Sequence, residues 1–270
     1  MKLRRSALLL VAALPLSLIG CAEQVDEHPA EDSTEAVFTE DDAKRVEDRS
    51  QELFTQGLEF AEDGSLFHSG GRYGESRVVK TDPSGAVIAE YELPDEHFAE
   101  GLTVVDDEVY LLTWRENVVH VLSADDLTPL RTFPLETEGW GTCYSDDGQL
   151  WVSDGTAEVR GYDPASMIEQ TSRTIVDGGG DEIEGINELE CIGDEIWANL
   201  WQEELVIVFD RGTGEIVRML DFSDLTPEWA GNNEVLNGIA FDAEADEIWL
   251  TGKLWEHFFI FDYAELRGAE

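Results

Sequence analysis

The chain repeats one β-rich unit at intervals of 41 to 52 residues, and this repeat restricts the fold more than any other feature of the sequence. Each unit begins with a short strand, passes an acidic or glycine-containing turn, and continues into a second strand centred on an aromatic residue. The five central aromatic residues are Phe67, Tyr110, Trp151, Trp197 and Trp249. A β-rich repeat of this length is typical of propeller blades with four strands each.

The last of the five units contains only three clear strands, over residues 237–241, 247–251 and 257–263. A blade without its fourth strand leaves an unpaired edge, which folded proteins avoid. The segment around residues 43–50 is available to fill this place. The sequence therefore predicts an all-β, five-bladed β-propeller over residues 43–270, with the ring closed by an N-terminal strand that completes the last blade. An open β-sandwich is the alternative fold.

The beginning of the chain has the pattern of an export signal. Basic residues precede an apolar run over residues 6–20, which is shorter than the ~20 residues that a spanning helix needs. The run ends in Leu-Ile-Gly-Cys at residues 18–21, which resembles a bacterial lipobox. We therefore expect residues 1–20 to be a lipoprotein signal peptide and Cys21 to be lipidated. The protein would then be exported and anchored on the extracytoplasmic side of a bacterial membrane.

The chain carries 60 acidic and 17 basic residues, a formal net charge of −43. This charge excludes nucleic acid as a partner, because phosphate backbones bind basic surfaces. Acidic runs such as residues 106–108 and 244–247 fall in expected turns, which favours an acidic surface suited to a salty medium over a dedicated site for cations or basic ligands. Residues 21–42 are acidic and poor in large apolar side chains, so we expect a disordered tether there.

The cysteine and histidine patterns restrict covalent and metal chemistry. Cys143 and Cys191 fall early in equivalent strands of neighbouring units, and an exported protein permits a disulfide. Their positions within the units differ by one residue, however, which directs them to opposite faces of their sheets and leaves the disulfide undecided. The five histidines lack the spacing of a zinc site, and the acidic loop over residues 177–182 lacks that of an EF-hand. We expect no metal, no cofactor and a monomer.

Each unit opens with a polar residue followed by, or close to, a glycine or glutamate. These five opening motifs are Phe54-Thr55-Gln56-Gly57-Leu58, Glu100-Gly101-Leu102-Thr103, Glu138-Gly139-Trp140-Gly141, Asn187-Glu188-Leu189-Glu190 and Asn237-Gly238-Ile239-Ala240. The first strand of each blade lines the axis of a propeller, so we expect the opening motifs to converge at one end of it. The ends of second strands add Trp114, Trp201 and Lys253, which is one of only four lysines in the chain.

The opening motifs, in this order, resemble those of the plant and bacterial glutaminyl cyclases of the five-bladed propeller type. The resemblance covers roughly residues 54–262, and its other pieces are Arg72-Tyr73-Gly74, Leu112-Thr113-Trp114, Ser153-Asp154-Gly155, Trp197-Ala198-Asn199 and Thr251-Gly252-Lys253-Leu254-Trp255. Two stretches depart from the family pattern. The family usually has a stretch like Tyr-Pro-His-Asp where this chain has residues 47–52, and it tends to have Glu-Ser where this chain has His68-Ser69.

The resemblance implies an enzyme that converts the N-terminal glutamine of peptides into pyroglutamate and releases ammonia without a metal. It implies that Glu100 is the general acid/base. We assign to Lys253 the role of offering positive charge to the substrate carbonyl oxygen. The residues expected to bind the substrate are Phe54, Gln56, Trp114, Trp140, Asn187 and Trp201, with Glu138 and Asn237 in support.

Simpler roles stay open for the same residues. Glu100 could be a glutamate that only hydrogen-bonds the backbone, and Lys253 could be a counter-ion in an acidic rim. Trp151, Trp197 and Trp249 are expected to pack between blades, whereas Trp229 and Trp255 have no assigned role. The rival functions are a calcium-dependent lactonase-like propeller hydrolase and a non-catalytic, lipid-anchored propeller that binds a partner.

Overall fold

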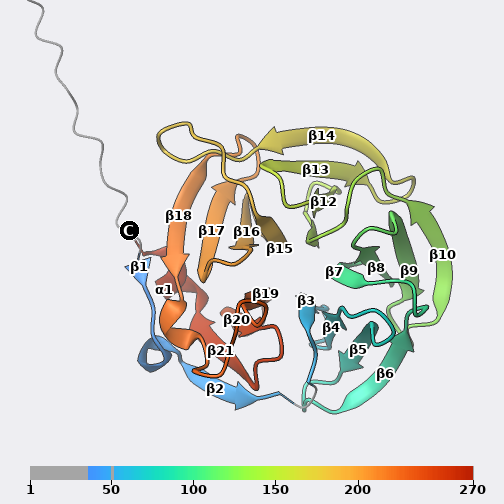
Figure 1. Ribbon diagram of the computed structural model, residues 1–270, viewed down its shortest axis with the longest axis horizontal. Helices are drawn as coiled ribbons and strands as arrows, with labels where there is room; N and C mark the ends of the chain where they lie inside the picture. The colour runs from blue at the N-terminus through green and yellow to red at the C-terminus, as the bar shows by residue number, and fades with distance from the viewer. Residues whose placement is uncertain (1–35, 50–51, 270) are drawn as a thin grey trace, which may run out of the picture. The chain divides into compact units, whose positions relative to one another are not determined.

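The computed structural model describes residues 36–49 and 52–269, which form five β-sheets around a common axis (Figure 1). Blade one contains β3 (Thr55–Phe60), β4 (Leu66–Gly70), β5 (Arg77–Thr81) and β6 (Val87–Glu92). Blade two contains β7 (Ala99–Val105), β8 (Glu108–Thr113), β9 (Val118–Ser123) and β10 (Pro129–Pro134). Blade three contains β11 (Thr142–Tyr144), β12 (Leu150–Ser153), β13 (Glu158–Asp163) and β14 (Ile168–Thr174).

The remaining elements complete the ring. Blade four contains β15 (Ile186–Ile192), β16 (Glu195–Leu200), β17 (Leu205–Asp210) and β18 (Ile216–Asp221). Blade five contains β19 (Leu236–Asp242), β20 (Glu247–Gly252) and β21 (His257–Asp262). The N-terminal segment contributes β1 (Ala36–Val37), the 3-10 turn η1 (Glu40–Asp42) and β2 (Arg45–Asp48), and two short helices are η2 (Ser223–Leu225) and α1 (Tyr263–Arg267). The five-bladed fold predicted from the sequence is confirmed.

An N-terminal strand closes the ring, as the sequence predicted. Strand β2 pairs antiparallel with β21, with Arg45 opposite Ile260 and Asp48 opposite His257. This pairing gives blade five its fourth and outermost strand, which Figure 1 shows at the rim. The N-terminal segment also supplies β1, which pairs in parallel with β18 as a fifth strand of blade four. One short segment therefore ties two neighbouring blades together.

The predicted tether is wrong at its C-terminal end, because residues 36–42 are folded. The aromatic ring of Phe38 stacks on Phe222 at a centroid distance of 5.4 Å and lies edge-on to Phe261 at 6.1 Å. The partly buried Phe38 ring thus packs on the core of blades four and five, and residues 36–42 fold despite their acidic composition. The predicted signal peptide and the lipidated Cys21 lie outside the described residues. Within the described ranges, no helix has the length and apolar character needed to cross a membrane.

The hydrophobic core lies between the blades, and the central aromatic residues of the second strands build it. Trp151 packs among residues of blades three and four, and Trp197 among residues of blades four and five. The ring of Trp249 meets that of Phe60 from blade one at 5.2 Å. These contacts confirm the predicted packing role. Trp255 is also buried, and its indole N–H donates to the Glu234 carbonyl at 2.7 Å.

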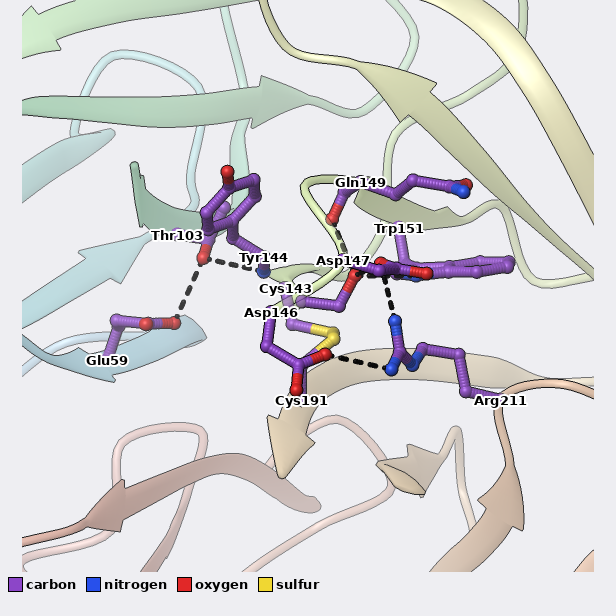
Figure 2. Close-up of a disulfide and its surroundings, with 11 residues drawn as sticks. Glu59, Thr103, Cys143, Tyr144, Asp146, Asp147, Gln149, Trp151, Cys191 and Arg211 are labelled. Atoms are coloured by element: carbon purple, nitrogen blue, oxygen red, sulfur yellow. Dashed lines mark hydrogen bonds and ion pairs between the residues drawn. A yellow bond between two sulfur atoms is a disulfide. The ribbon is translucent and has the colours of Figure 1, made fainter. Parts of the chain in front are cut away.

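A disulfide joins Cys143 of β11 to Cys191 of β15, with a Cα–Cα distance of 5.4 Å (Figure 2). Cys143 lies opposite Trp151, whereas Glu190 lies opposite Trp197, so Cys191 is one residue out of step, as the sequence indicated. Neighbouring blades face each other with opposite sides of equivalent sheets. The one-residue offset that counted against the disulfide is therefore what lets the two side chains meet.

An arginine near the disulfide connects the same two blades (Figure 2). Arg211, just after β17 of blade four, has its Nη2 atom 2.9 Å from Asp146 and its Nη1 atom 2.5 Å from Asp147, both in the β11–β12 turn. The disulfide and this ion pair hold blades three and four together by covalent and electrostatic contacts, in addition to the hydrophobic core between them.

Arg49 stabilises the seam where blade five meets blade one. Its guanidinium donates to the carbonyl oxygens of Gly252 at 3.0 Å and Trp255 at 2.8 Å, and to the Thr251 hydroxyl at 3.1 Å. It also approaches His68 Nε2 at 3.4 Å. Burial lowers the pKa of Arg49 to about 10, which leaves it charged at neutral pH. The two stretches that depart from the family pattern therefore contact each other across the seam.

We predict that Arg49→Met lowers the free energy of unfolding by about 2–4 kcal/mol, because two or more partly buried oxygens lose their hydrogen-bond donor. Chemical denaturation of the purified variant measures this change. Arg267→Met is the matched control, because Arg267 is exposed on α1, lies over the Tyr263 ring at 5.9 Å, and forms no hydrogen bond or ion pair with a described residue. Equal stability of the two variants would show that Arg49 does not hold the seam.

Candidate active site

The opening motifs of the blades converge at one end of the axis because glycines let the innermost strands approach closely. A Cβ atom on Gly57 would lie 2.5 Å from the Leu102 backbone nitrogen of the next blade. A Cβ atom on Gly101 would likewise lie 2.7 Å from the Gly141 Cα atom. The Gly101 N–H donates to the Trp140 carbonyl at 2.7 Å. These contacts hold the residues beside each glycine in one fixed ring.

Polar side chains at the ends of second strands position the opening motif of the next blade. The Ser69 hydroxyl donates to the Glu100 carbonyl at 2.6 Å, and the Ser153 hydroxyl donates to the Asn187 carbonyl at 2.6 Å. In the same way, the Asn199 side-chain oxygen accepts from the backbone N–H of Gly238 at 2.8 Å. This recurring contact explains why small polar residues stand at these strand ends, a role that the sequence alone had not assigned.

Glu100 and Lys253 form an electrostatic pair at this end of the ring. Their residues are only 5% and 4% exposed. Burial raises the pKa of Glu100 well above its usual range, the Lys253 ammonium opposes that rise, and the carboxylates of Glu116 and Glu138 add to it. Burial lowers the pKa of Lys253, and Glu100 opposes that change. Each side chain therefore favours the charged form of the other.

Lys253 differs from the other buried lysine of the described chain in having an uncommitted ammonium. Lys80 donates to the Ala124 carbonyl at 2.9 Å and lies 3.9 Å from Asp63. Lys253 contacts the ring of Phe54 at 5.2 Å, and no carboxylate of the described residues lies within 4.0 Å of its Nζ atom. The counter-ion role would need such a direct pair. The ammonium is thus available to an external group.

Glu138 organises the aromatic wall. One of its carboxylate oxygens accepts from the indole N–H of Trp114 at 2.9 Å and from that of Trp140 at 3.1 Å, and the other accepts from Arg115 at 3.1 Å. The Trp140 ring meets that of Trp201 edge-on at 5.6 Å. Three of the predicted tryptophans are therefore brought together, with two of them oriented by one carboxylate.

The amide side chains contribute unpaired acceptors. Gln56, Asn187 and Asn237 are almost fully buried. The Asn237 side-chain N–H group donates to the Thr55 carbonyl at 3.0 Å and approaches the Gln56 oxygen at 3.3 Å. The side-chain oxygens of Asn187 and Asn237 are buried, and neither accepts a hydrogen bond from any described residue. Buried polar atoms without a partner are rare, so these oxygens suit a ligand with N–H donors.

Several residues of the site were not predicted from the sequence. Glu116 accepts from the Tyr73 hydroxyl at 2.9 Å and from the Phe98 backbone N–H at 3.2 Å. Phe98 extends the aromatic wall by meeting Trp114 at 5.6 Å. The Arg115 guanidinium stacks 3.7 Å from the centroid of the Trp114 ring. Only Tyr73 lay in a motif shared with the family, and the others have no regular spacing that would reveal them.

Other candidate regions lie apart from this cluster. A cavity of about 580 Å³ lies in the seam between blades one and five. Its lining includes Phe60, Trp249 and Phe258, and no predicted site residue borders it. Trp229 is 52% exposed in the loop between β18 and β19. Across the part of the chain that the structure describes, no three histidine, cysteine, aspartate or glutamate side chains are grouped to hold a metal ion.

Known proteins resemble this chain in both sequence and fold. The crystal structure of a glutaminyl cyclase from Myxococcus xanthus matches with a TM-score of 0.74 and 32% identity, covering 81% of this chain and 94% of that one. A glutaminyl-peptide cyclotransferase from Arabidopsis thaliana is 33% identical over 210 residues, 76% of this chain. The chain spans 65% of the length of that plant protein. Residues 13–262 match the family model described as glutamine cyclotransferase, and the chain belongs to this family.

Proposed function

We propose that the protein is a glutaminyl-peptide cyclotransferase, which converts the N-terminal glutamine of a peptide into pyroglutamate and releases ammonia. The observation that carries the proposal is the buried pair of Glu100 and uncommitted Lys253 beside an indole-walled cluster, in a chain of the glutamine cyclotransferase family. Its substrate is a peptide or protein with an N-terminal glutamine.

The reaction is an intramolecular acyl transfer. The α-amine nitrogen attacks the carbonyl carbon of the glutamine side chain, a C–N bond forms, and a tetrahedral oxyanion results. The bond from that carbon to the side-chain nitrogen then breaks. Glu100 accepts the proton that the attacking nitrogen loses and returns it to the leaving nitrogen, which departs as ammonia. The main task of the site is to hold the side chain folded back on the amine.

The surroundings of Glu100 suit this double role. A carboxyl whose pKa is raised by burial holds its proton more readily than an exposed one, which suits a group that must both accept and return a proton. The unpaired oxygens of Asn187 and Asn237 accept from the N–H groups of the substrate. The faces of Trp114 and Trp140 exclude water and favour the cationic amine.

Lys253 stabilises the charge that develops during the reaction. The substrate oxygen becomes negative in the tetrahedral state, and an ammonium in a site of low polarity stabilises that charge more strongly than water does. Glu100 favours the charged form of Lys253, and no carboxylate of the described residues lies within 4.0 Å of its Nζ atom, so the ammonium can also contact the substrate oxygen. These steps use only side chains of the protein, and we propose that the reaction needs no metal ion.

We also propose that the enzyme is an exported, monomeric lipoprotein anchored through Cys21. The disulfide between Cys143 and Cys191 supports export, because such bonds persist in oxidising compartments. The acidic composition supports a surface adapted to salt.

We expect Glu100→Gln to lower turnover at least ~10²-fold, the scale of losing a general acid/base, while the fold is retained. Ammonia release from a glutamine-initiated dipeptide measures the loss. Glu108→Gln is the control, because Glu108 pairs with Arg131 on blade two at the opposite end of the sheet. A Glu100→Gln enzyme with full activity would exclude the proton-transfer role.

The pH dependence tests the coupling between Glu100 and Lys253. Since the ammonium lowers the pKa of Glu100, Lys253→Met should raise that pKa further. The acidic limb of the kcat/KM profile requires Glu100 to be deprotonated, so it should move to higher pH in the variant. Lys80→Met should leave the limb in place. An acidic limb that stays fixed or moves to lower pH in Lys253→Met contradicts the coupling.

Removal of divalent cations separates the cyclase from a calcium-dependent hydrolase. We expect turnover of the glutaminyl dipeptide to be unchanged after treatment with a chelator and exhaustive dialysis, because the proposed proton transfers need no metal. Loss of activity that added calcium restores would contradict the proposed mechanism.

A further inference from the structure

A second cavity of about 300 Å³ adjoins the proposed active site on the blade-one side. Phe54 forms the wall between them, because its ring contacts Lys253 on the active-site side and also lines this cavity. The charged residues of its lining are Arg72, Arg77, Glu52 and Glu75, and Leu254 also lines it. We name this space the Arg72 cavity.

Arg72 is the uncommitted cation of this cavity. Its guanidinium lies 5.0 Å from the centroid of the Phe54 ring. No carboxylate of the described residues lies within 4.0 Å of it, although the chain carries 60 acidic residues. Arg115, on the other side of the site, is by contrast paired with Glu138 at 3.1 Å. A stacked guanidinium without an acidic partner is oriented to receive one.

Arg77 adds a second positive charge that is only partly used. Its Nε atom lies 3.2 Å from Glu90, and its Nη2 atom donates weakly to the Glu52 carbonyl at 3.4 Å. The side chains of Glu52 and Glu75 are exposed, and neither forms an ion pair with an arginine among the described residues. The cavity is therefore lined by two guanidinium groups, of which that of Arg77 is paired with Glu90, and by two exposed glutamates that are not paired with either arginine.

The cavity lies within reach of a peptide whose glutamine occupies the active site. Lys253 and Arg72 both lie about 5 Å from the centre of the Phe54 ring, so their charges are at most about 10 Å apart, and two extended residues span ~7 Å. Leu254 follows Lys253 directly and adopts a left-handed backbone with φ of 63°. Its N–H donates to the Leu53 carbonyl at 2.9 Å, which fixes the two sites relative to each other.

We propose that the Arg72 cavity binds a carboxylate of the residue that follows the N-terminal glutamine, and so makes the enzyme selective for peptides that carry one there. The carboxylate belongs either to an acidic side chain or to the free C-terminus of a dipeptide. Arg72 forms the principal ion pair, and Arg77 raises the positive potential around it. This inference rests on the proposed function.

The test compares peptides that differ only in one charge. Gln-Glu-amide against Gln-Gln-amide tests a side-chain carboxylate, and Gln-Gly against Gln-Gly-amide tests a C-terminal one. At low ionic strength we expect the wild-type kcat/KM to favour the charged member of at least one pair about fivefold, as for an accessible ion pair. Arg72→Gln should abolish the preference while the kcat/KM of the neutral amides stays unchanged, and Arg72→Lys should retain part of it.

Arg131→Gln is the matched control, because it removes the same charge from the outer strand of blade two, away from the site, and should keep the preference. A wild-type enzyme that shows no preference in either pair overturns the inference. An Arg72→Gln variant that loses activity equally on all four peptides also overturns it, because the role of Arg72 is then general. If the wild-type protein releases ammonia from none of the peptides, the proposed cyclase function itself fails.

Discussion

The close approach of the five innermost strands is the constraint on which the rest of the structure depends. At Gly141 the space is so small that a Cβ atom would lie 2.0 Å from the Asn187 carbonyl oxygen of the next blade. Only glycine fits there, so the backbone of one blade packs directly on its neighbour. Glu100 precedes Gly101 and Trp140 precedes Gly141 in the sequence, and Asn187 packs against Gly141. These three residues consequently occupy fixed positions around one small region, as a catalytic group requires.

Charge in this protein is distributed in two opposite ways. The chain has a formal net charge of −43, whereas the candidate site and the cavity beside it hold two cations, Lys253 and Arg72, that have no carboxylate of the described residues within 4.0 Å. Lys80 shows what a structural lysine looks like here, with a carbonyl and a carboxylate beside it. Lys253 and Arg72 have no carboxylate of the described residues within 4.0 Å, and both face the same ring, Phe54. In a chain with so few basic residues, this arrangement supports a ligand that brings its own negative or developing negative charge.

The seam between the first and last blades shows how a buried arginine is accommodated beside a histidine. The Arg49 and His68 side chains meet there at 3.4 Å. Burial lowers the pKa of His68 well below its usual range, and Arg49 adds to that effect, so the imidazole stays neutral beside the guanidinium. A cation next to a neutral acceptor is compatible with this partly buried place.

The sequence by itself determined the number of blades and the closing strand, because a strand repeat and its turns are local patterns. Relations between blades were decided only by the tertiary structure. The disulfide between Cys143 and Cys191 forms because opposite faces of the sheets of blades three and four lie against each other. The fold of residues 36–42 depends on the stacking of Phe38 on Phe222. The roles proposed for Glu138 and Arg72 depend likewise on which groups neighbouring blades bring near them. Such contacts join residues far apart in the chain, so no spacing in the sequence records them.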